Sequence, residues 1–203
     1  MAGLMNKAVR IGVIAEEKND VEVIYELTCK VIRENQFLIS KFLGHGCGKV
    51  RGKSQAWAQN LLAGGCLHLV MVHDLDTRDE QALRTLLENK IDDSDFEQKV
   101  ILIPVEEIEA WLLSDSEALK TVFNMRKLPK VPRWPEKIKN PKEFLGEVVR
   151  KNSKSQYLNT IHNKHIANAL SISKLNRCPS FSPYPEFLKS AFPKASSHHP
   201  KSK

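Results

Sequence analysis

Four short apolar segments, separated by stretches with helical periodicity, constrain the fold of this chain most strongly. The apolar segments cover residues 8–15, 37–43, 67–73 and 100–105. The other stretches place apolar residues three or four positions apart, as helices do, and cover residues 20–34, 54–62, 78–90, 106–113 and 115–123. Strands that alternate with helices predict right-handed crossovers and a parallel sheet. Because the strands lack polar alternation, we expect an α/β, Rossmann-like fold with helices on both faces of the sheet.

Three of these predicted strands are each followed by an acidic cluster. The clusters lie at residues 16–20, 74–76 and 106–109. Parallel strands gather their carboxyl ends at one edge of the sheet, where α/β proteins place their sites, so we expect these carboxylates to crowd together. Crowded carboxylates repel one another, and a divalent cation relieves the repulsion. We therefore predict a Mg²⁺ or Mn²⁺ site with ligands drawn from Glu16, Asp74, Asp76, Glu107 and Glu109.

The acidic pair Asp74 and Asp76 carries most of this prediction. Alternate residues of an extended segment point the same way, so both carboxylates can face one ion. With Glu16 they are the predicted catalytic residues, and either Glu16 or a metal-bound hydroxide would act as the base. The same acids also have structural interpretations. Asp20 and Asp79 would cap helices, and residues 106–109 would supply favourable charge to the first turn of a helix.

A segment rich in glycine and basic residues, 44–52, is predicted to be a loop, with Ser54 capping the helix that follows. It does not fit a P-loop, because Cys47 stands where that motif requires glycine. We interpret the segment as a basic loop that contacts phosphates, or as a solvated loop without that role. The predicted nucleic-acid contacts are Lys49, Arg51, Lys53 and Arg78.

Charge divides the chain into an acidic and a basic part. The net charge of +7 is the sum of −6 over residues 1–125 and +13 over residues 126–203. We predict an α/β domain at 8–125, a basic helical extension at 126–195 and a disordered tail at 196–203, with helices at 141–151, 157–170 and 185–191 in the extension. The division indicates a metal site beside a surface that binds a polyanion, or else a basic tail that only aids solubility.

Several classes of protein do not fit the composition. No apolar run approaches the roughly 20 residues that cross a membrane, and residues 1–10 lack the apolar core of a signal peptide. We therefore expect a soluble, cytoplasmic protein with no membrane partner. The four cysteines are scattered and form no CxxC pair, which favours reduced thiols. His162 and His165 lack a second pair of ligands for zinc, and no local signature of a Ser or Cys nucleophile is present.

The acidic clusters resemble the motifs of the TOPRIM (topoisomerase–primase) domain. That family has a strand ending in Glu-Gly-x-x-Asp/Glu, matched by Glu16 and Asp20, and a later strand ending in Asp-x-Asp, matched by residues 74–76. The run EEIEAWLLSD at 106–115 is similar to a small bacterial TOPRIM-like family related to the nuclease domains of OLD-type proteins. The resemblance covers residues 9–115, and the chain departs from it at Glu17, where the family has glycine.

The resemblance implies Mg²⁺- or Mn²⁺-dependent phosphodiester hydrolysis in defence against phage or mobile DNA. Our leading hypothesis is therefore a nuclease, and the alternative is a non-catalytic nucleic-acid-binding or regulatory module with a degenerate metal site. A receiver-like phosphoacceptor domain fits less well, because Glu106-Glu107 follows the last strand where a Lys-bearing strand is expected. The sequence is compatible with DNA, RNA or a nucleotide as substrate, and with a monomer, a homodimer or a complex with another protein.

Overall fold

The computed structural model describes residues 8–32 and 36–193, and it contains one parallel sheet of four strands. The strands are β1 (Val9–Ala15), β2 (Phe37–Leu43), β3 (His68–Val72) and β4 (Gln98–Leu102). Their order across the sheet is β2-β1-β3-β4, and every neighbouring pair is parallel. The predicted α/β fold is confirmed. Because the chain leaves β1 toward one edge and returns through β3 on the other side, the topological switch point lies between β1 and β3.

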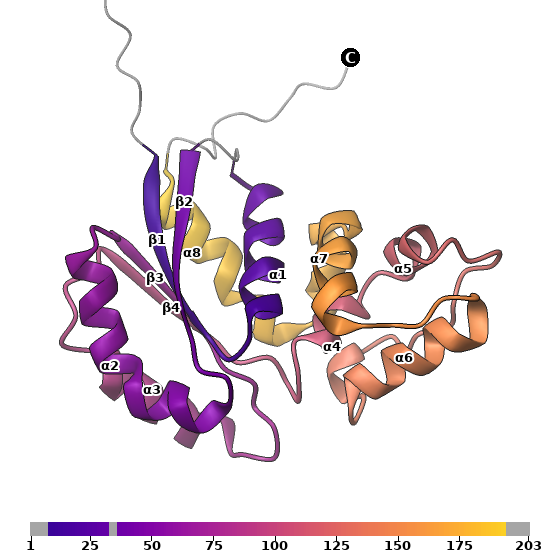
Figure 1. Ribbon diagram of the computed structural model, residues 1–203, viewed down its shortest axis with the longest axis horizontal. Helices are drawn as coiled ribbons and strands as arrows, with labels where there is room; N and C mark the ends of the chain where they lie inside the picture. Colours follow the sequence, from indigo (N-terminus) through magenta and orange to yellow (C-terminus); the bar gives the residue numbers. More distant parts are fainter. Residues whose placement is uncertain (1–7, 33–35, 194–203) are drawn as a thin grey trace, which may run out of the picture.

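Helices cover both faces of the sheet, and the alternation of side chains along each strand explains why (Figure 1). Ile11, Val13 and Ala15 of β1 face α1 (Lys18–Cys29) within one core cluster. Ile14 faces the opposite way, into a second cluster built on α2 (Cys47–Ala63) and α3 (Glu80–Ile91). A Cβ on Gly12 would lie 2.9 Å from a side-chain carbon of Leu61, so glycine lets α2 approach β1 closely.

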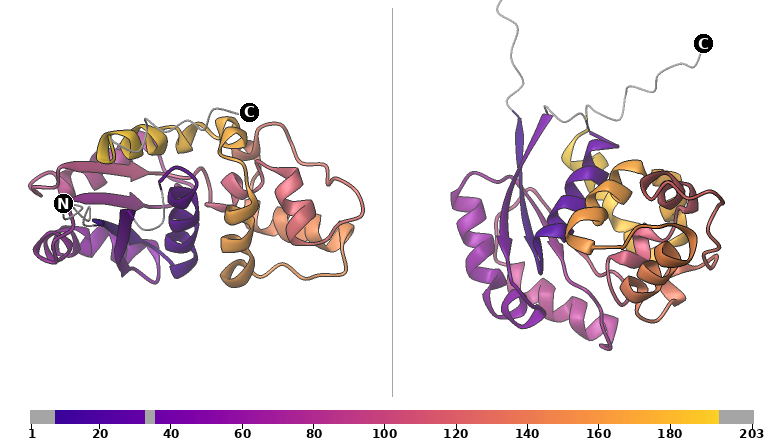
Figure 2. Two further views of the ribbon diagram at one scale, coloured as in Figure 1. Left: turned by 90° about the horizontal axis from the view of Figure 1, so that it is seen from above. Right: turned by 45° about the vertical axis from the view of Figure 1, so that its right-hand side comes forward.

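The second half of the chain forms a helical extension beside the sheet (Figures 1 and 2). Its elements are α4 (Glu109–Leu112), α5 (Ser116–Val122), η2 (Pro135–Lys137), α6 (Pro141–Asn152), α7 (Asn159–Ala169), η3 (Ile172–Arg177), η4 (Pro179–Phe181) and α8 (Pro183–Ala191). Helix α7 packs on α1, and α8 returns to pack on β4. The core cluster on the α1 face continues into the extension, where it includes Tyr184 and Phe187.

Most predicted elements are confirmed, but two predictions on the basic segment are wrong. Helix α2 begins at Cys47, so most of the stretch predicted as a loop at 44–52 is helical. Ser54 does not cap the helix but lies buried within it. The turn before α2 is made instead by His45 and Gly46, whose φ angles are 51° and 124°. Strand β4 ends at Leu102, three residues before the predicted end.

Two expectations from the composition, on membrane-spanning segments and on cysteines, can be compared with the described part of the chain. Within residues 8–32 and 36–193, no helix is long and apolar enough to cross a membrane. Cys29, Cys66 and Cys178 are free thiols, as expected for scattered cysteines. The predicted tail at 196–203 lies outside the residues that the structure describes.

Candidate metal centre

The loops that follow β3 and β4 are held side by side beyond the ends of the strands. The backbone N–H of Leu75 donates to the carbonyl of Pro104 at 2.9 Å, and that of Asp76 donates to the carbonyl of Glu106 at 3.4 Å. Pairing of the two strands thus continues into both acidic clusters. Asp76 and Glu106 also have left-handed backbones, with φ of 50° and 61°, a strained conformation that clusters at functional sites.

The carboxyl group of Asp74 is the point where the three acidic clusters meet. Burial raises its pKa well above the usual value, and the nearby carboxylates raise it further. In decreasing order of effect these carboxylates are Asp20, Glu109, Glu16 and Glu107. Asp74 belongs to the second cluster and these four acids to the first and third, so the three clusters lie within electrostatic range of one another at the carboxyl edge of the sheet.

Glu16 and Asp20, which follow β1, also have raised pKa values of about 7. Burial is the main cause for both, and the second cause for Glu16 is the charge of Asp76. The Oε1 atom of Glu16 is buried without a hydrogen-bond partner in the described part of the chain, and its nearest basic atom is His73 Nδ1 at 3.5 Å. Asp20 accepts a hydrogen bond from the backbone N–H of Glu17 at 2.9 Å, so it both belongs to the cluster and stabilises the start of α1.

The helical extension positions the acids of the third cluster. Glu107 Oε2 accepts a hydrogen bond from the backbone N–H of Lys142 at 3.0 Å, in the first turn of α6. Glu109 Oε1 accepts hydrogen bonds of 3.1 Å from the hydroxyl of Tyr157 and from Asn163 Nδ2. Because these three partners are distant in the sequence, Glu107 and Glu109 do more than place favourable charge at the start of α4.

Asp76 lies at the rim of the cluster and not in its interior. Its side chain is 45% exposed and pairs with Arg78 Nη1 at 2.5 Å. Asp74 and Asp76 share this loop but have different surroundings, because Asp74 is half-buried near other acids and Asp76 lies beside a cation and solvent. Arg78, predicted as a phosphate contact, lies close enough to lower the pKa of Glu16.

The predicted phosphate contacts Lys49, Arg51 and Lys53 lie on the first two turns of α2 and not on a loop. Arg51 alone among them reaches inward, with Nη1 3.3 Å from His73 Nε2. His73 Nδ1 lies 2.7 Å from the carbonyl of Asp74, which can only accept, so Nδ1 carries the proton and Nε2 accepts from Arg51. Burial lowers the pKa of His73, which keeps the ring neutral.

His73 was missed by sequence reasoning, although one signal could have identified it. It is the last residue of the apolar segment that leads into Asp74, and it is fully buried. Because the sites of open α/β sheets lie at the carboxyl ends of the strands, a polar side chain at that position is a candidate for the site. His73 is thus the link between the acids of β3 and the cations of α2.

The donor set suits a hard divalent cation. Carboxylate oxygens are the preferred ligands of Mg²⁺ and Mn²⁺, and Glu16 has a buried oxygen that accepts no hydrogen bond from a described residue. The carboxylates lie near one another, but they do not surround a common position for an ion. Among the described residues, no group of three or more His, Cys, Asp or Glu side chains is already arranged to hold an ion.

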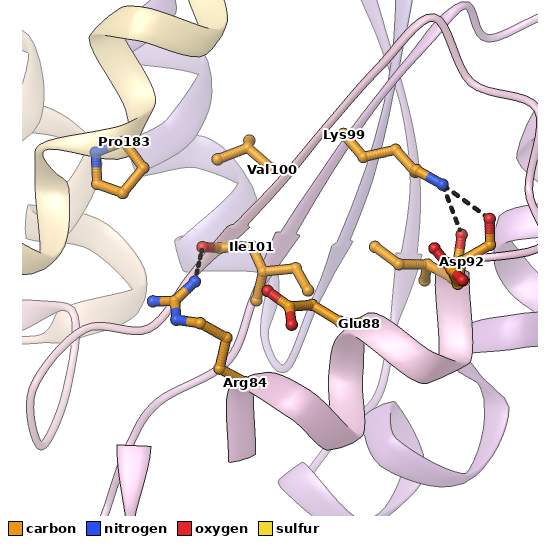
Figure 3. Close-up of a pocket in the computed structure, with 8 residues that line it drawn as sticks. Arg84, Glu88, Asp92, Lys99, Val100, Ile101 and Pro183 are labelled. Atoms are coloured by element: carbon orange, nitrogen blue, oxygen red, sulfur yellow. Dashed lines mark hydrogen bonds between the residues drawn. The ribbon is translucent and has the colours of Figure 1, made fainter. Parts of the chain in front are cut away.

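A second hollow lies away from the acids, between α3, β4 and Pro183 (Figure 3). Its volume is about 270 Å³. Two of the cations that line it are already engaged with backbone carbonyls: Arg84 donates to Ile101, and Lys99 donates to Ile91 and Asp92 at the end of α3. These contacts stabilise the fold, so we assign the functional site to the acidic edge.

The parallel sheet and its acidic carboxyl edge define an α/β protein with a candidate site at a topological switch point. The chain belongs to the family described as a domain of unknown function (DUF4276), which matches residues 31–189. That match includes the second and third acidic clusters but not the first. No curated protein and no solved structure matches the chain.

Proposed function

We propose that this protein is a metal-dependent nuclease that hydrolyses the phosphodiester bonds of DNA or RNA. The observation that carries the proposal is the half-buried carboxyl group of Asp74, which lies within electrostatic range of four other acids at the carboxyl edge of the sheet. Two of these acids, Asp20 and Glu109, are buried and the others are half-buried, and such a cluster opposes folding unless protons or a cation neutralise it. An acidic cluster at the topological switch point is therefore better explained by a cation site than by a structural role.

The surroundings of Glu16 suit proton transfer near neutral pH. Its pKa of about 7 lies close to the working pH, where a general base is most effective. Arg51 and Arg78 are close enough to stabilise its charge, and they would face the phosphate of a substrate. Glu16, Asp20, Asp74 and Glu109 would hold Mg²⁺ or Mn²⁺, which would supply charge neutralisation and polarise a phosphoryl oxygen.

The wider proposal combines this site with the charge of the extension. A net charge of +13 over residues 126–203 offers cations to a nucleic-acid backbone. We propose that the domain is TOPRIM-like, related to OLD-type nucleases, that it acts in the cytoplasm, and that it takes part in defence against phage or mobile DNA. The motif resemblance at Glu16, at residues 74–76 and at 106–115 supports that relationship.

The test of the proposal removes the central acids. Asp74→Asn combined with Asp76→Asn should abolish Mn²⁺-dependent cleavage of DNA and RNA. The chain offers a matched control in Asp93→Asn with Asp95→Asn, a pair with the same spacing that is exposed beyond the opposite end of α3. If the first double variant still cleaves as fast as this control, the site is assigned wrongly.

A second function, a non-catalytic nucleic-acid-binding or regulatory module, is favoured by one set of contacts. Glu107 and Glu109 are already satisfied by hydrogen bonds from the extension, and the described acids are not arranged around one ion. Glu17, where TOPRIM domains have glycine, adds a further charge beside the site. Calorimetry separates the two functions, because a catalytic site should bind Mn²⁺ at millimolar concentration and a degenerate one should not.

A further inference from the structure

One tryptophan of the chain is exposed, and it lies in the basic segment that joins α5 to α6. Trp134 is 44% exposed, whereas Trp111 is fully buried and Trp57 is half-buried, stacked on Phe42. The guanidinium of Arg133 lies over the Trp134 ring, 5.4 Å from its centroid. An exposed indole beside a stacked cation is a surface on which a nucleic-acid base can stack.

The segment around Trp134 is strongly cationic. All of its basic residues are exposed: Arg126, Lys127, Lys130, Arg133, Lys137 and Lys139. None of them forms an ion pair with a carboxylate of the described residues. The single acid of the segment, Glu136, faces inward and accepts a hydrogen bond from the backbone N–H of Ser180 at 3.2 Å. The outward surface therefore presents positive charge and one aromatic ring.

The segment is held in place and is not a free linker. Arg177 donates hydrogen bonds of 2.7 Å to the carbonyls of Pro132, Arg133 and Ser114. Glu136 is held by Ser180, whose hydroxyl also accepts a hydrogen bond from the indole N–H of Trp111 in the core. A binding surface fixed in this way loses little conformational freedom when a ligand binds.

The segment also lies near the candidate metal centre. Helix η2, which follows Trp134, packs on α4, the helix that carries Glu109. Glu136 in η2 is close enough to Glu80 at the start of α3 for the two charges to interact, and α3 follows the loop that carries Asp76. A strand bound at Trp134 would therefore be near the acids.

We propose that residues 126–139 form a platform for single-stranded nucleic acid, on which Trp134 stacks against a base and the exposed cations contact phosphates. The proposal rests on the proposed function for the nature of the ligand, and it adds that the strand is unpaired. Stacking requires a base whose face is open, which a duplex does not offer. A partner protein could also use an exposed tryptophan, but the unpaired cations favour a polyanion.

The test measures binding without cleavage, using the full-length protein in EDTA with 20-nucleotide oligo-dT, oligo-rU and a duplex of equal length. Binding of a single strand should quench the fluorescence of Trp134. Trp134→Ala should weaken binding roughly tenfold, and Trp134→Phe should retain most of the affinity, because it keeps an aromatic face. Trp57→Phe is the control and should bind as the wild type does. Comparison of oligo-dT with oligo-rU shows whether the platform prefers the DNA or the RNA strand.

The cations give a second, independent measurement. Lys137→Gln combined with Lys139→Gln should make the dependence of log K on log salt shallower by about 1.4, since each single-strand phosphate contact contributes about 0.7. Lys41→Gln with Lys189→Gln, two exposed lysines of other elements, should leave the slope unchanged.

Three results would overturn the platform: unchanged affinity in Trp134→Ala, equal dependence on Trp134 for duplex and single strand, or no binding of single strands at low salt. Failure of the nuclease proposal is a separate outcome. If Asp74→Asn with Asp76→Asn keeps the cleavage activity while Trp134→Ala loses affinity, the platform stands and the assigned metal centre does not.

Discussion

Glu107, in the loop after β4, accepts a hydrogen bond of 3.0 Å from the backbone N–H of Lys142 in α6, 35 positions later in the chain. The first N–H groups of a helix have no partner within the helix, and a carboxylate satisfies them while interacting favourably with the helix dipole. The contact therefore stabilises α6 and orients Glu107 at once. With the contacts of Glu109 to Tyr157 and Asn163, it makes the helical extension part of the candidate metal centre.

Tyr157→Phe should weaken metal binding without altering the acids themselves. The substitution removes one of the two hydrogen bonds that orient Glu109 Oε1 and should reduce affinity for Mn²⁺ by about 10-fold or more, as measured by calorimetry. Loss of this hydrogen-bonded, half-buried hydroxyl should also lower the free energy of unfolding by about 1–2 kcal/mol.

A matched control distinguishes these two effects. Tyr184→Phe removes another hydrogen-bonded hydroxyl, one that is buried and lies 2.6 Å from Thr28 Oγ1 near the C-terminal end of α1. It should lower stability by a similar amount and leave the affinity for Mn²⁺ unchanged. Equal losses of affinity in both variants would contradict the positioning role of Tyr157.

The stability of the metal-free protein should depend on pH because of Glu16 and Asp20. Their pKa values of about 7 lie above the ordinary values of 4.5 and 3.8, so the folded state binds these protons more tightly than the unfolded state does. Their contribution is therefore complete at low pH and is lost as pH rises toward and through about 7. The free energy of unfolding should fall by up to about 1.4 kcal/mol per pH unit for each group over that range.

Denaturant titrations in EDTA between about pH 5 and pH 8 measure this effect. Burial lowers the pKa values of His68 and His73, so these histidines reduce the free energy of unfolding as pH falls below their ordinary pKa. Because this effect opposes that of the acids, each variant is compared with the wild type at the same pH. Glu16→Gln with Asp20→Asn should flatten the decline, and the exposed Glu88→Gln should not. Added Mg²⁺ should raise the stability of the wild type most at high pH. If the free energy of unfolding of Glu16→Gln with Asp20→Asn falls with pH as steeply as that of the wild type, these two acids are not the cause.

Ser54→Ala should stabilise the protein. The Ser54 hydroxyl is buried in the middle of α2 and has no hydrogen-bond partner among the described residues. Removing it relieves the cost of a buried polar group and improves helix propensity, together worth about 1 kcal/mol. Gln55→Ala, at the exposed neighbouring position, measures propensity alone. Thermal unfolding should show a larger increase for Ser54→Ala than for Gln55→Ala, and an equal increase would argue against the burial cost.

Arg51→Gln should raise the pKa of His73. The charge of Arg51 lowers that pKa, and its guanidinium donates to Nε2, the nitrogen that a further proton would occupy. NMR titration of the histidine ring should show an upward shift in the variant. Lys53→Gln, on the exposed side of the same helix, should cause no shift. An unchanged His73 in Arg51→Gln would mean that the two side chains are not in contact in solution.

The fold could be predicted from the sequence because its signals are local. Four apolar segments and the helices between them indicate a covered parallel sheet, and β2 has the predicted bounds. The start of α2 could not be predicted in this way, because Gly48 and Gly52 have low helix propensity and resemble a loop. The helix extends through them since Val50, Ala58 and Leu61 lie on one face and bury against the sheet.

The candidate site could be predicted only in part. That acids from three strand ends would meet follows from parallel topology, and Asp74 lies where they do. The partners of Glu107 and Glu109 come from residues 142, 157 and 163, and no local pattern specifies which helix of the extension will approach the sheet. His73 and Asp20 acquire their roles from burial, which depends on the completed fold.

The return of α8 to the sheet affects how the chain folds during synthesis. Strand β4 is complete at Leu102, but Phe187 and Leu188, which help to cover its α1 face, are made much later. Until then the growing chain carries an apolar sheet face without its final cover. The sheet and the extension should thus become stable as one unit only after α8 has left the ribosome, and until then the uncovered apolar face should favour aggregation or chaperone binding.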